Sequence, residues 1–265
     1  MLITIITVTY NAQEHICKTI ESILNQTNKD FEYIVIDGNS KDKTVDILRK
    51  YTEKIEQKEF QLHDFKWISE PDTGLYDAMN KGLDMATGEF VWFMNAGDKL
   101  FDNNTLAEIQ NHLQSNPDAD IVYGQSLIID QNDTPIGERH KIAPKKLTVN
   151  SFLNGLVVGH QSILVRKSIA THYDLQYTVA ADYDWVISAV KKSHQNLYID
   201  NYLSRFMIAG FSTVHRKKAW KDRFLIMKKQ FGLCKTLWAH FLITLKYPFT
   251  KKYYLLLIAF IGSWW

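Results

Sequence analysis

The sequence has little cysteine and lacks the signatures of several common enzyme classes. Only Cys17 and Cys234 occur among its 265 residues, and neither belongs to a Cys-x-x-Cys or Cys/His cluster. This argues against a zinc ribbon and a disulfide framework and favours a reducing compartment. The patterns Gly-x-Gly-x-x-Gly, Gly-x-x-x-x-Gly-Lys-Ser/Thr, Gly-x-Ser-x-Gly and His-Glu-x-x-His are all absent. An NAD enzyme and a P-loop nucleotidase are therefore not favoured.

Neither end of the sequence has the pattern of a signal peptide or a transmembrane helix. Residues 1–10 read MLITIITVTY, a β-branched run with no basic region and no small-residue cleavage site. The uncharged segment 253–265 is thirteen residues long, shorter than the ~20 needed to span a bilayer. We expect a buried strand at the first segment and an interfacial rather than a spanning segment at the last.

What the sequence does contain is the composition of a globular protein. Hydrophobic residues make up 46% of the chain and charged residues 23%, which excludes a disordered or collagen-like protein. Its length suits one large domain or two small ones. The net charge of +2 conceals an asymmetry, because residues 216–252 hold eleven Lys or Arg and one acid, so that the remainder carries −8. A basic tail on an acidic body suggests a partner for the tail.

Apolar runs that suit buried strands alternate with stretches of helical spacing in the first half of the chain. Strands are predicted at 2–8, 31–36, 66–69 and 90–94. Each is followed by a predicted helix, so we expect an α/β fold with a mostly parallel central sheet and helices on both faces. The second half is expected to add strands at 121–129 and 161–166 and a helix at 182–190. These elements would form the second wall of a cleft.

A polar cluster follows each of the first four predicted strands. The clusters are Thr-Tyr-Asn at 9–11, Asp-Gly-Asn-Ser-Lys-Asp at 37–42, Glu-Pro-Asp-Thr-Gly at 70–74 and Asn-Ala-Gly-Asp at 95–98. Taken singly, each suits an ordinary turn. Together they favour a ligand site, because ligands bind beyond the carboxyl ends of parallel strands. A hard oxygen site there suits Mg²⁺ or Mn²⁺, which would neutralise a diphosphate in place of a P-loop.

With their neighbours, these clusters resemble the motifs of a known enzyme family. The matching segments are Thr7–Asn11, Ile36–Thr44, Glu70–Gly74, Asn80–Gly82 with Ala86–Glu89, and Asn95–Asp98. Their order and spacing are similar to those of inverting family 2 glycosyltransferases with the GT-A fold, of the type that builds bacterial surface polysaccharides. A fainter match at Ala181–Trp185 extends the resemblance to about residue 215.

The resemblance implies a role for each matching residue. Asp98 would ligate Mn²⁺ or Mg²⁺, with His215 as a further candidate ligand, and Asp182 would be the catalytic base. The nucleotide and donor sugar would be held by Thr9, Tyr10, Asn11, Asp37, Asn39, Asp72, Lys81, Asn95 and Gly97. The acceptor side would include His160, Gln161 and Trp185. These roles suit the chemistry, since a cation stabilises the leaving diphosphate and a second carboxylate takes the acceptor's proton.

Several positions leave alternatives open. Asn95 and Gly97 stand where the family often has acids, so Asp98 is the only carboxylate of its turn. Met79 stands where many members have Arg, and Lys81 would either supply that charge or be a solvated helix lysine. Asp184 competes with Asp182 for the role of base, because on a helix the two face different sides.

Other residue types have ordinary structural interpretations. His160 and His215 would either line the site or be hydrogen-bonded structural residues. Both acids of 182–184 would equally suit the start of a helix, where negative charge is favoured. The aromatic residues of the second half would stack on sugar rings or form core packing.

The tail is predicted to be a separate unit. We expect a catalytic domain at 1–215, with a nucleotide-binding half at 1–118 and an acceptor half at 119–215, and an amphipathic helical tail at 216–265. Basic residues and tryptophans at helical spacing favour a helix lying on an anionic membrane surface. The alternative is that the tail packs on the catalytic body or on another subunit of a homo-oligomer.

The sequence therefore predicts a metal-dependent inverting glycosyltransferase on the cytoplasmic face of the cell membrane. It would move a sugar from a nucleotide sugar, most simply a UDP-sugar, to a glycan or lipid-linked glycan, with no nucleic acid as partner. A nucleotidyltransferase is one alternative, although residues 9–15 contain no basic side chain to grip a triphosphate. A catalytically silent binding subunit is the other, because of the missing acids at 95 and 97.

Overall fold

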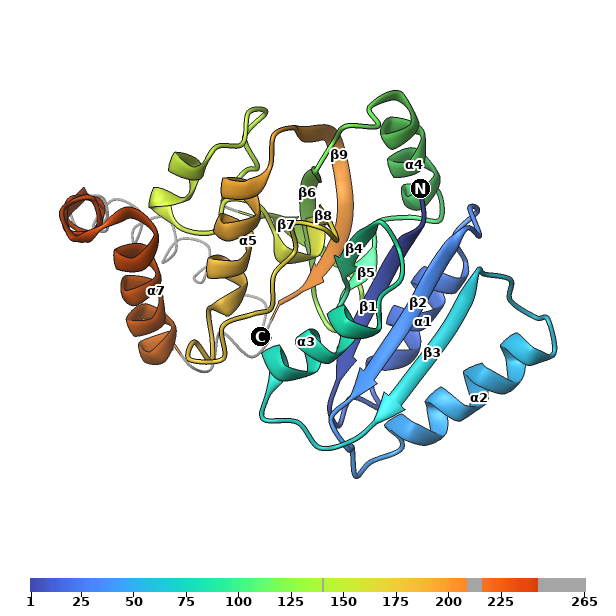
Figure 1. Ribbon diagram of the computed structural model, residues 1–265. Helices are drawn as coiled ribbons and strands as arrows, with labels where there is room; N and C mark the ends of the chain where they lie inside the picture. Colours follow the sequence, from blue (N-terminus) through green and yellow to red (C-terminus); the bar gives the residue numbers. More distant parts are fainter. Residues whose placement is uncertain (140, 209–215, 243–265) are drawn as a thin grey trace.

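The computed structural model describes residues 1–139, 141–208 and 216–242 (Figure 1). The first half contains β1 (Ile3–Thr9), α1 (Ile16–Leu24), β2 (Phe31–Asp37), α2 (Thr44–Glu56), β3 (Asp64–Ser69), α3 (Leu75–Met85), β4 (Phe90–Phe93), β5 (Lys99–Leu100) and α4 (Thr105–Ser115). The second half contains β6 (Ile121–Ile129), β7 (Pro135–Glu138), the 3₁₀ helices η1 (Val149–Asn154) and η2 (His160–Ser162), β8 (Ile163–Arg166), α5 (Ala181–Lys192), β9 (Asn196–Met207) and α7 (Arg216–Phe231). Together the strands form one sheet in the order β3-β2-β1-β4-β8-β6-β9-β5, with β7 paired to β6.

The first four strands in this order are parallel and end at one edge of the sheet. Every residue of β1, β2 and β4 is buried, as expected for a parallel sheet covered on both faces. Thr9 pairs with Asp37 across β1 and β2, and Asp37 pairs with Ser69 across β2 and β3. The polar clusters that follow these strands are therefore brought to neighbouring positions, as the sequence predicts.

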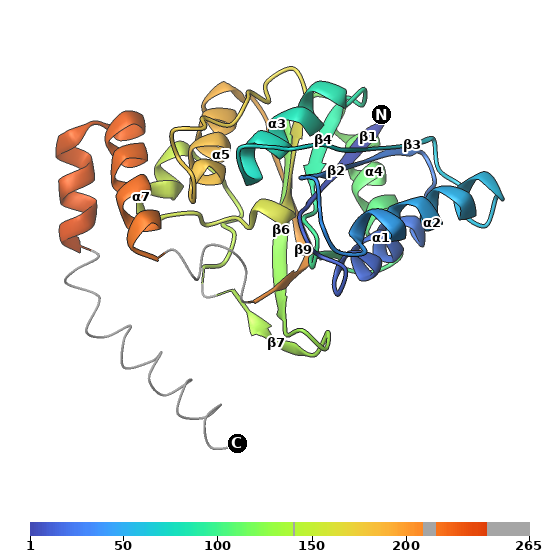
Figure 2. The same ribbon diagram turned by 90° about the horizontal axis from the view of Figure 1, so that it is seen from below.

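Helices cover both faces of the sheet (Figures 1 and 2). On one face α1, α2 and α4 pack in a core that includes Ile20 and Leu106, and on the other α3 and α5 pack in a core that includes Met79 and Ile187. Apolar residues of α1 recur on one side at positions 16, 20, 23 and 24, all of them buried. The predicted α/β class with helices on both faces is confirmed.

The second half continues the sheet with mixed strand directions. β8 is antiparallel to both β4 and β6, while β6 and β9 are parallel. The predicted strand 161–166 begins instead as η2 and becomes a strand only at Ile163. The long strand β9 was not predicted, because its sequence NLYIDNYLSRFM mixes polar and apolar residues without alternation. It ends at the same edge as β1 and β4.

The predicted boundary between body and tail at residue 216 does not match the packing. Ile226 and Met227 of α7 belong to the same buried core as α5. Asp222 of α7 is buried and accepts a hydrogen bond from the Val179 N–H at 3.0 Å. α7 is therefore part of the body, and a further helix at 233–242 follows it. Of the helices in the described ranges, none has the length and hydropathy needed to cross a membrane.

Candidate functional site

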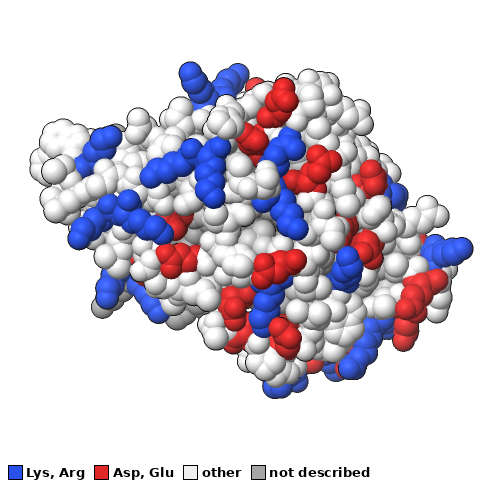
Figure 3. Space-filling model, viewed as in Figure 1, with Lys and Arg blue, Asp and Glu red and all other residues white. Residues whose placement is uncertain are grey.

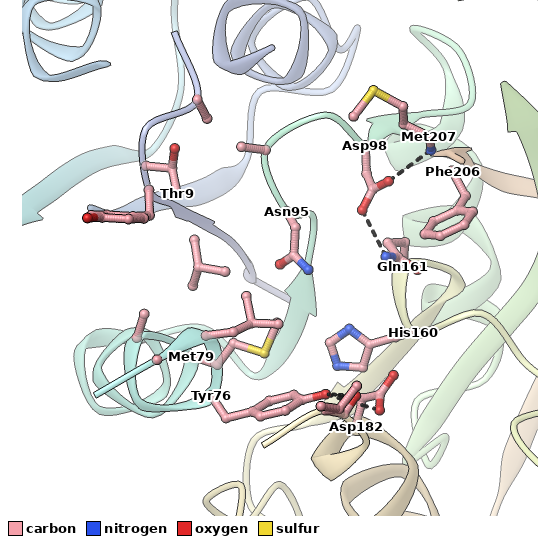
Figure 4. A pocket seen from close by; sticks show the side chains of 18 of the residues that line it. Thr9, Tyr76, Met79, Asn95, Asp98, His160, Gln161, Asp182, Phe206 and Met207 are labelled. Carbon is pink, nitrogen blue, oxygen red and sulfur yellow. Dashed lines mark hydrogen bonds between the residues drawn. The ribbon is translucent and has the colours of Figure 1, made fainter. Parts of the chain in front are cut away.

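A cavity of about 670 Å³ lies at the carboxyl ends of β1 and β4 (Figure 4). One wall comes from the first half of the chain and contains Thr9, Tyr10, Asp72, Tyr76, Met79, Asn95 and Asp98, among others. The opposite wall comes from the second half and contains Arg139, Leu156, His160, Gln161, Val179, Asp182, Phe206 and Met207, among others. The cavity thus lies where the sequence analysis placed the cleft.

Two buried oxygens on the first wall have no hydrogen-bond partner. They are Thr9 Oγ1, at the last residue of β1, and Asn95 Oδ1, in the turn that follows β4. Both residues line the cavity. A buried polar atom without a partner costs free energy, so such atoms are expected where a ligand completes the hydrogen bonding. Tyr10, whose side chain is 62% exposed, lies beside them and presents an aromatic face.

The turns after β1 and β2 hold each other in place. Asn11 and Asn39 have positive φ angles of 48° and 63°, which asparagine tolerates better than most residues. The Asn11 N–H donates to Ser40 Oγ, and Asn11 Oδ1 accepts from the Lys41 N–H. Neither asparagine lines the cavity, so the structure places both in the supporting turns rather than on the ligand surface.

Asp37 lies behind the cavity wall, contrary to the expected contact with a base. Its side chain is fully buried and its carboxylate accepts hydrogen bonds from the Ser40 N–H, Ser40 Oγ and Ser69 Oγ. Asp72, in contrast, lines the cavity and accepts a hydrogen bond from the Gly74 N–H. Space between the two turns depends on Gly38, since a Cβ there would lie 2.5 Å from Asp72 Oδ2.

Asp98 is the only carboxylate at the end of β4, and it is buried. Its Oδ2 accepts from Gln161 Nε2 at 2.8 Å and its Oδ1 from the Met207 N–H at 3.1 Å. Burial raises the pKa of Asp98 to about 7, while these two hydrogen bonds act in the opposite direction. The two donors come from η2 and the end of β9, so the second half of the chain fixes an acid that belongs to the first (Figure 4).

The turn of Asp98 requires a glycine. Gly97 has a φ of 101°, and a Cβ at this position would lie 2.6 Å from Met207 Cε. The Gly97 N–H donates to Thr19 Oγ1 and not into the cavity, which Gly97 does not line. Gly97 therefore shapes the turn instead of contacting the ligand.

The structure separates the two candidate bases. Asp182, in the first turn of α5, lines the cavity, and its Oδ1 lies 3.3 Å from the Tyr76 hydroxyl and accepts from the Tyr183 N–H at 2.9 Å. Burial raises the pKa of Asp182, and the charge of Arg139 is among the opposing influences. Asp184 faces α7, where it accepts hydrogen bonds from Lys229 and Gln230. Only Asp182 is placed to act on a molecule in the cavity.

His160 and Trp185 belong to an aromatic cluster beneath the cavity. His160 stacks on Phe93, and its Nε2 lies 2.7 Å from the Tyr173 hydroxyl. Burial lowers the pKa of His160 to about 4, so the ring is neutral at pH 7. Trp185 is buried, stacks on Tyr173 and donates from Nε1 to the Thr171 carbonyl. Trp185 is therefore a core residue rather than an acceptor contact, whereas His160 reaches the cavity wall.

Two other candidates do not reach the described cavity. Lys81 pairs with Glu70 at 2.8 Å and donates to the Pro71 carbonyl, so its charge is engaged within the loop that follows β3. His215 lies outside the described residues. Met79, which stands where many family members have arginine, is buried and lines the cavity.

Sequence reasoning missed three contributors to the site. Tyr76 belongs to none of the motifs, although its hydroxyl reaches Asp182 from α3. Met207 acts through its backbone N–H, for which no sequence signal exists. Arg139 lines the cavity from a segment with no recognisable pattern.

The chain offers few oxygen ligands to a metal ion. In the portion of the chain that the structure describes, no group of three His, Cys, Asp or Glu residues is arranged to hold one. Asp98 and the unpartnered Asn95 Oδ1 nevertheless line the same cavity. Mg²⁺ commonly binds through one or two carboxylates together with substrate phosphates and waters. The residues present therefore fit a cation whose remaining ligands come from a bound diphosphate.

Known proteins resemble the chain in sequence. Residues 4–173 match the family model for glycosyl transferase family 2. The PGL/p-HBAD biosynthesis glycosyltransferase of Mycobacterium bovis is 30% identical over 189 residues, which cover 70% of this chain and 68% of that protein. The putative teichuronic acid biosynthesis glycosyltransferase TuaG of Bacillus subtilis is 30% identical over 166 residues, 63% of this chain and 62% of that protein.

Solved structures resemble it in fold. S. aureus TarS 1–349 in complex with UDP-GlcNAc has a TM-score of 0.64 at 18% identity, covering 85% of this chain and 65% of that one. The mannosyltransferase PcManGT from Pyrobaculum calidifontis in complex with GDP-Man and Mn²⁺ has a TM-score of 0.64 at 16% identity, covering 90% and 69%. The expected GT-A fold is thereby confirmed. Because the family model matches residues 4–173 and a relative is 30% identical over 70% of the chain, the chain belongs to glycosyl transferase family 2.

Proposed function

We propose that the chain is a metal-dependent inverting glycosyltransferase that moves a sugar from a UDP-sugar to a glycan or lipid-linked glycan of a cell-surface polysaccharide. The observation that carries the proposal is that Asp98 and Asp182 line one cavity from opposite walls. A UDP donor is supported by the complex of TarS with UDP-GlcNAc. The polysaccharide assignment is supported by relatives named for PGL/p-HBAD and teichuronic acid biosynthesis. Membership of family 2 displaces the nucleotidyltransferase alternative.

The first wall would hold the nucleotide. Thr9 Oγ1 and Asn95 Oδ1 are the buried polar atoms that await a partner, and Tyr10 offers an exposed ring on which a base can stack. Asp72 would accept hydrogen bonds from sugar hydroxyls at the same wall. Asn11, Asn39 and Asp37 would act from behind, by fixing the turns that carry these groups.

A cation would be held by Asp98 and Asn95 at the end of β4. When bound there, Mn²⁺ or Mg²⁺ would neutralise the negative charge that develops on the departing diphosphate. Gln161 and the Met207 N–H orient the Asp98 carboxylate for this contact. The complex of PcManGT with Mn²⁺ supports the use of a divalent ion.

Asp182 would take the proton from the attacking hydroxyl of the acceptor. The bond from the anomeric carbon to the acceptor oxygen forms as the bond to the diphosphate oxygen breaks, so one displacement inverts the anomeric centre. Burial raises the pKa of Asp182, which suits a base that must hold the proton it receives. The Tyr183 N–H holds the carboxylate, and the Tyr76 hydroxyl, which donates to the Val179 carbonyl at 2.9 Å, lies beside it at 3.3 Å.

The test is turnover with defined donors. Purified full-length protein is incubated with UDP-GlcNAc, UDP-glucose or GDP-mannose, with Mn²⁺ or with EDTA, and release of the nucleoside diphosphate is measured. We expect release from a UDP-sugar only in the presence of the metal. Binding of UDP without turnover of any donor would favour the silent binding subunit, and turnover in EDTA would reject the metal.

We further propose that the helix at 233–242 contacts the cytoplasmic surface of the membrane. Its apolar residues Leu233, Leu237, Trp238 and Phe241 are each about half exposed, and Lys235 is exposed beside them. Such a combination suits an anionic lipid interface. α7 itself packs on α5, so only the residues beyond it are assigned to the lipid surface.

Liposome sedimentation tests the membrane contact. Trp238→Ser combined with Phe241→Ser should weaken association with anionic vesicles, while Ile136→Ser, at an exposed apolar residue of β7, should leave it unchanged. Part of the wild-type association should be lost in 1 M NaCl, because salt screens attraction between charges. Failure of the wild type to bind either anionic or neutral vesicles would contradict the membrane contact.

A further inference from the structure

Three basic side chains converge beside the cavity, on the wall formed by the second half. Lys141 Nζ and Arg223 Cζ both lie within 3.2 Å of the point where a Cβ would stand at Gly155. Arg139 lies next to the same backbone segment, with Nη2 donating to the Leu156 carbonyl at 3.2 Å. Gly155 has a φ of 103° and no side chain, and this leaves room for the two cations.

The charge of Asp182 acts on Arg139 across the cavity wall, and Lys141 Nζ donates to the Asn154 carbonyl at 2.7 Å. Within residues 1–139, 141–208 and 216–242, neither Arg139 nor Lys141 nor Arg223 takes part in a salt bridge. Nε and Nη2 of Arg223 are buried and have no hydrogen-bond acceptor. Burial and the positive charges of Arg223 and Arg139 lower the pKa of Lys141 to about 8. All three residues are partly buried, and like charges held together in such positions destabilise the fold unless an anion joins them.

The position of the cluster identifies the molecule that would bring the anion. Arg139 lines the same cavity as Asp182, and Asp182 lies across that cavity from Thr9 (Figure 4). Arg223 comes from α7, on the far side of α5 from the strands β1, β2 and β3 (Figure 1). The surface over α5 and α7 is rich in Lys and Arg, whereas both charge signs mix over β3 and α2 (Figure 3). The cluster therefore adjoins the base and not the nucleotide wall.

We propose that Arg139, Lys141 and Arg223 bind an anionic group, a phosphate or a carboxylate, that the acceptor carries. The inference rests on the proposed function, since it takes the molecule that meets Asp182 to be the acceptor. Planar guanidinium groups match the paired oxygens of both anions, and the Lys141 ammonium adds a point charge. An anionic acceptor would be bound here with its attacking hydroxyl directed to Asp182.

Binding of small anionic sugars tests the proposal. With UDP and Mg²⁺ saturating the donor side, the full-length protein is titrated calorimetrically with glucose 6-phosphate, glucuronate and, as the neutral control, glucose. We expect one of the two anions to bind at least about tenfold more tightly than glucose. Arg223→Gln and Lys141→Gln should each remove that preference, and Lys146→Gln, at an exposed lysine nearby in the chain, should keep it.

The possible failures are distinguishable. Absence of UDP binding by the wild type would overturn the proposed function, whereas UDP binding with no preference for either anion would overturn this inference alone. Displacement of the bound anion by UDP would assign the cations to the donor diphosphate and overturn the acceptor assignment. A thermal melt adds an independent readout: Lys141→Met should raise Tm, because it removes an uncompensated charge, and a fall in Tm together with retained anion binding would contradict the proposal.

Discussion

The two halves of the molecule place their functional residues by different means. In residues 1–118, each polar cluster directly follows a parallel strand, so neighbours at the sheet edge are neighbours in strand order. In the second half, Gln161 precedes β8, Asp182 begins α5 and Met207 ends β9. These residues meet only because the order of strands in the sheet, β4-β8-β6-β9, differs from their order along the chain. The first half contributes the proposed nucleotide edge and Asp98, and the second half contributes Asp182 and the groups that orient Asp98.

The largest effect is predicted at Asp182, the proposed catalytic base. Asp182→Asn should lower kcat by about 10²- to 10⁴-fold, because it removes the proton acceptor and keeps the shape of the side chain. Asp184→Asn is the matched control two residues away, and it should change kcat little, since Asp184 binds Lys229 and Gln230. Steady-state kinetics with a UDP-sugar would decide. A larger loss in Asp184→Asn would show that the structure separates the two acids incorrectly.

Asp98 joins the two halves, and its removal should be the next most damaging change. Asp98→Asn keeps an acceptor for Gln161 or Met207 but loses the charge, so turnover should fall about 10²-fold and UDP affinity should no longer depend on Mn²⁺. Asp118→Asn, at an exposed acid of the same half, should behave as wild type. Unchanged metal dependence in Asp98→Asn would move the cation elsewhere.

A substitution at Asp37 distinguishes a residue that supports the turn after β2 from one that contacts the nucleotide. Asp37→Ala leaves the Ser40 N–H and the Ser40 and Ser69 hydroxyls without their acceptor, and it should lower the free energy of unfolding by about 3 kcal/mol. Asp46→Ala, which removes only an exposed pair with Arg49, should change it by less than about 0.5 kcal/mol. Urea unfolding measures both. A stable Asp37→Ala protein that binds UDP weakly would restore the direct contact first expected from the sequence.

His160 should give the smallest effect, and one that depends on pH. Its folded pKa of about 4 lies below the ~6.5 of an unfolded histidine, so the unfolded chain takes up the proton first as pH falls. Stability from this group is complete above about pH 6.5 and declines by up to about 3 kcal/mol towards pH 4. His160→Phe should show a shallower decline when unfolding is followed across that range. Equal slopes for the two proteins would contradict a buried neutral His160.

The difference between the two halves also explains which features of the fold and the site the sequence could predict. Strands and turns of the first half were predictable because buried runs and the clusters after them are local patterns, and Asp98 and Asp182 follow from the family motifs. Asp37 and Asn39 do not line the cavity, and the sequence could not show this because a motif residue that supports a turn has the same sequence signal as one that contacts a ligand. The role of Met207 and the approach of Arg139 to Arg223 depend on tertiary packing, which no local pattern encodes. β9 was missed for the same reason, since pairing with β6 and not alternation makes it a strand.

The most direct test of the division between a binding half and a reactive half is the affinity for UDP. Calorimetry in the presence of Mn²⁺ would compare the wild type with Thr9→Val combined with Asn95→Leu, and with Asp182→Asn. Because Thr9 Oγ1 and Asn95 Oδ1 have no partner in the free protein, their removal should leave stability unchanged or higher and weaken UDP binding by at least about tenfold. Asp182→Asn should bind UDP as the wild type does. Normal UDP affinity in the double variant together with its loss in Asp182→Asn would contradict the account.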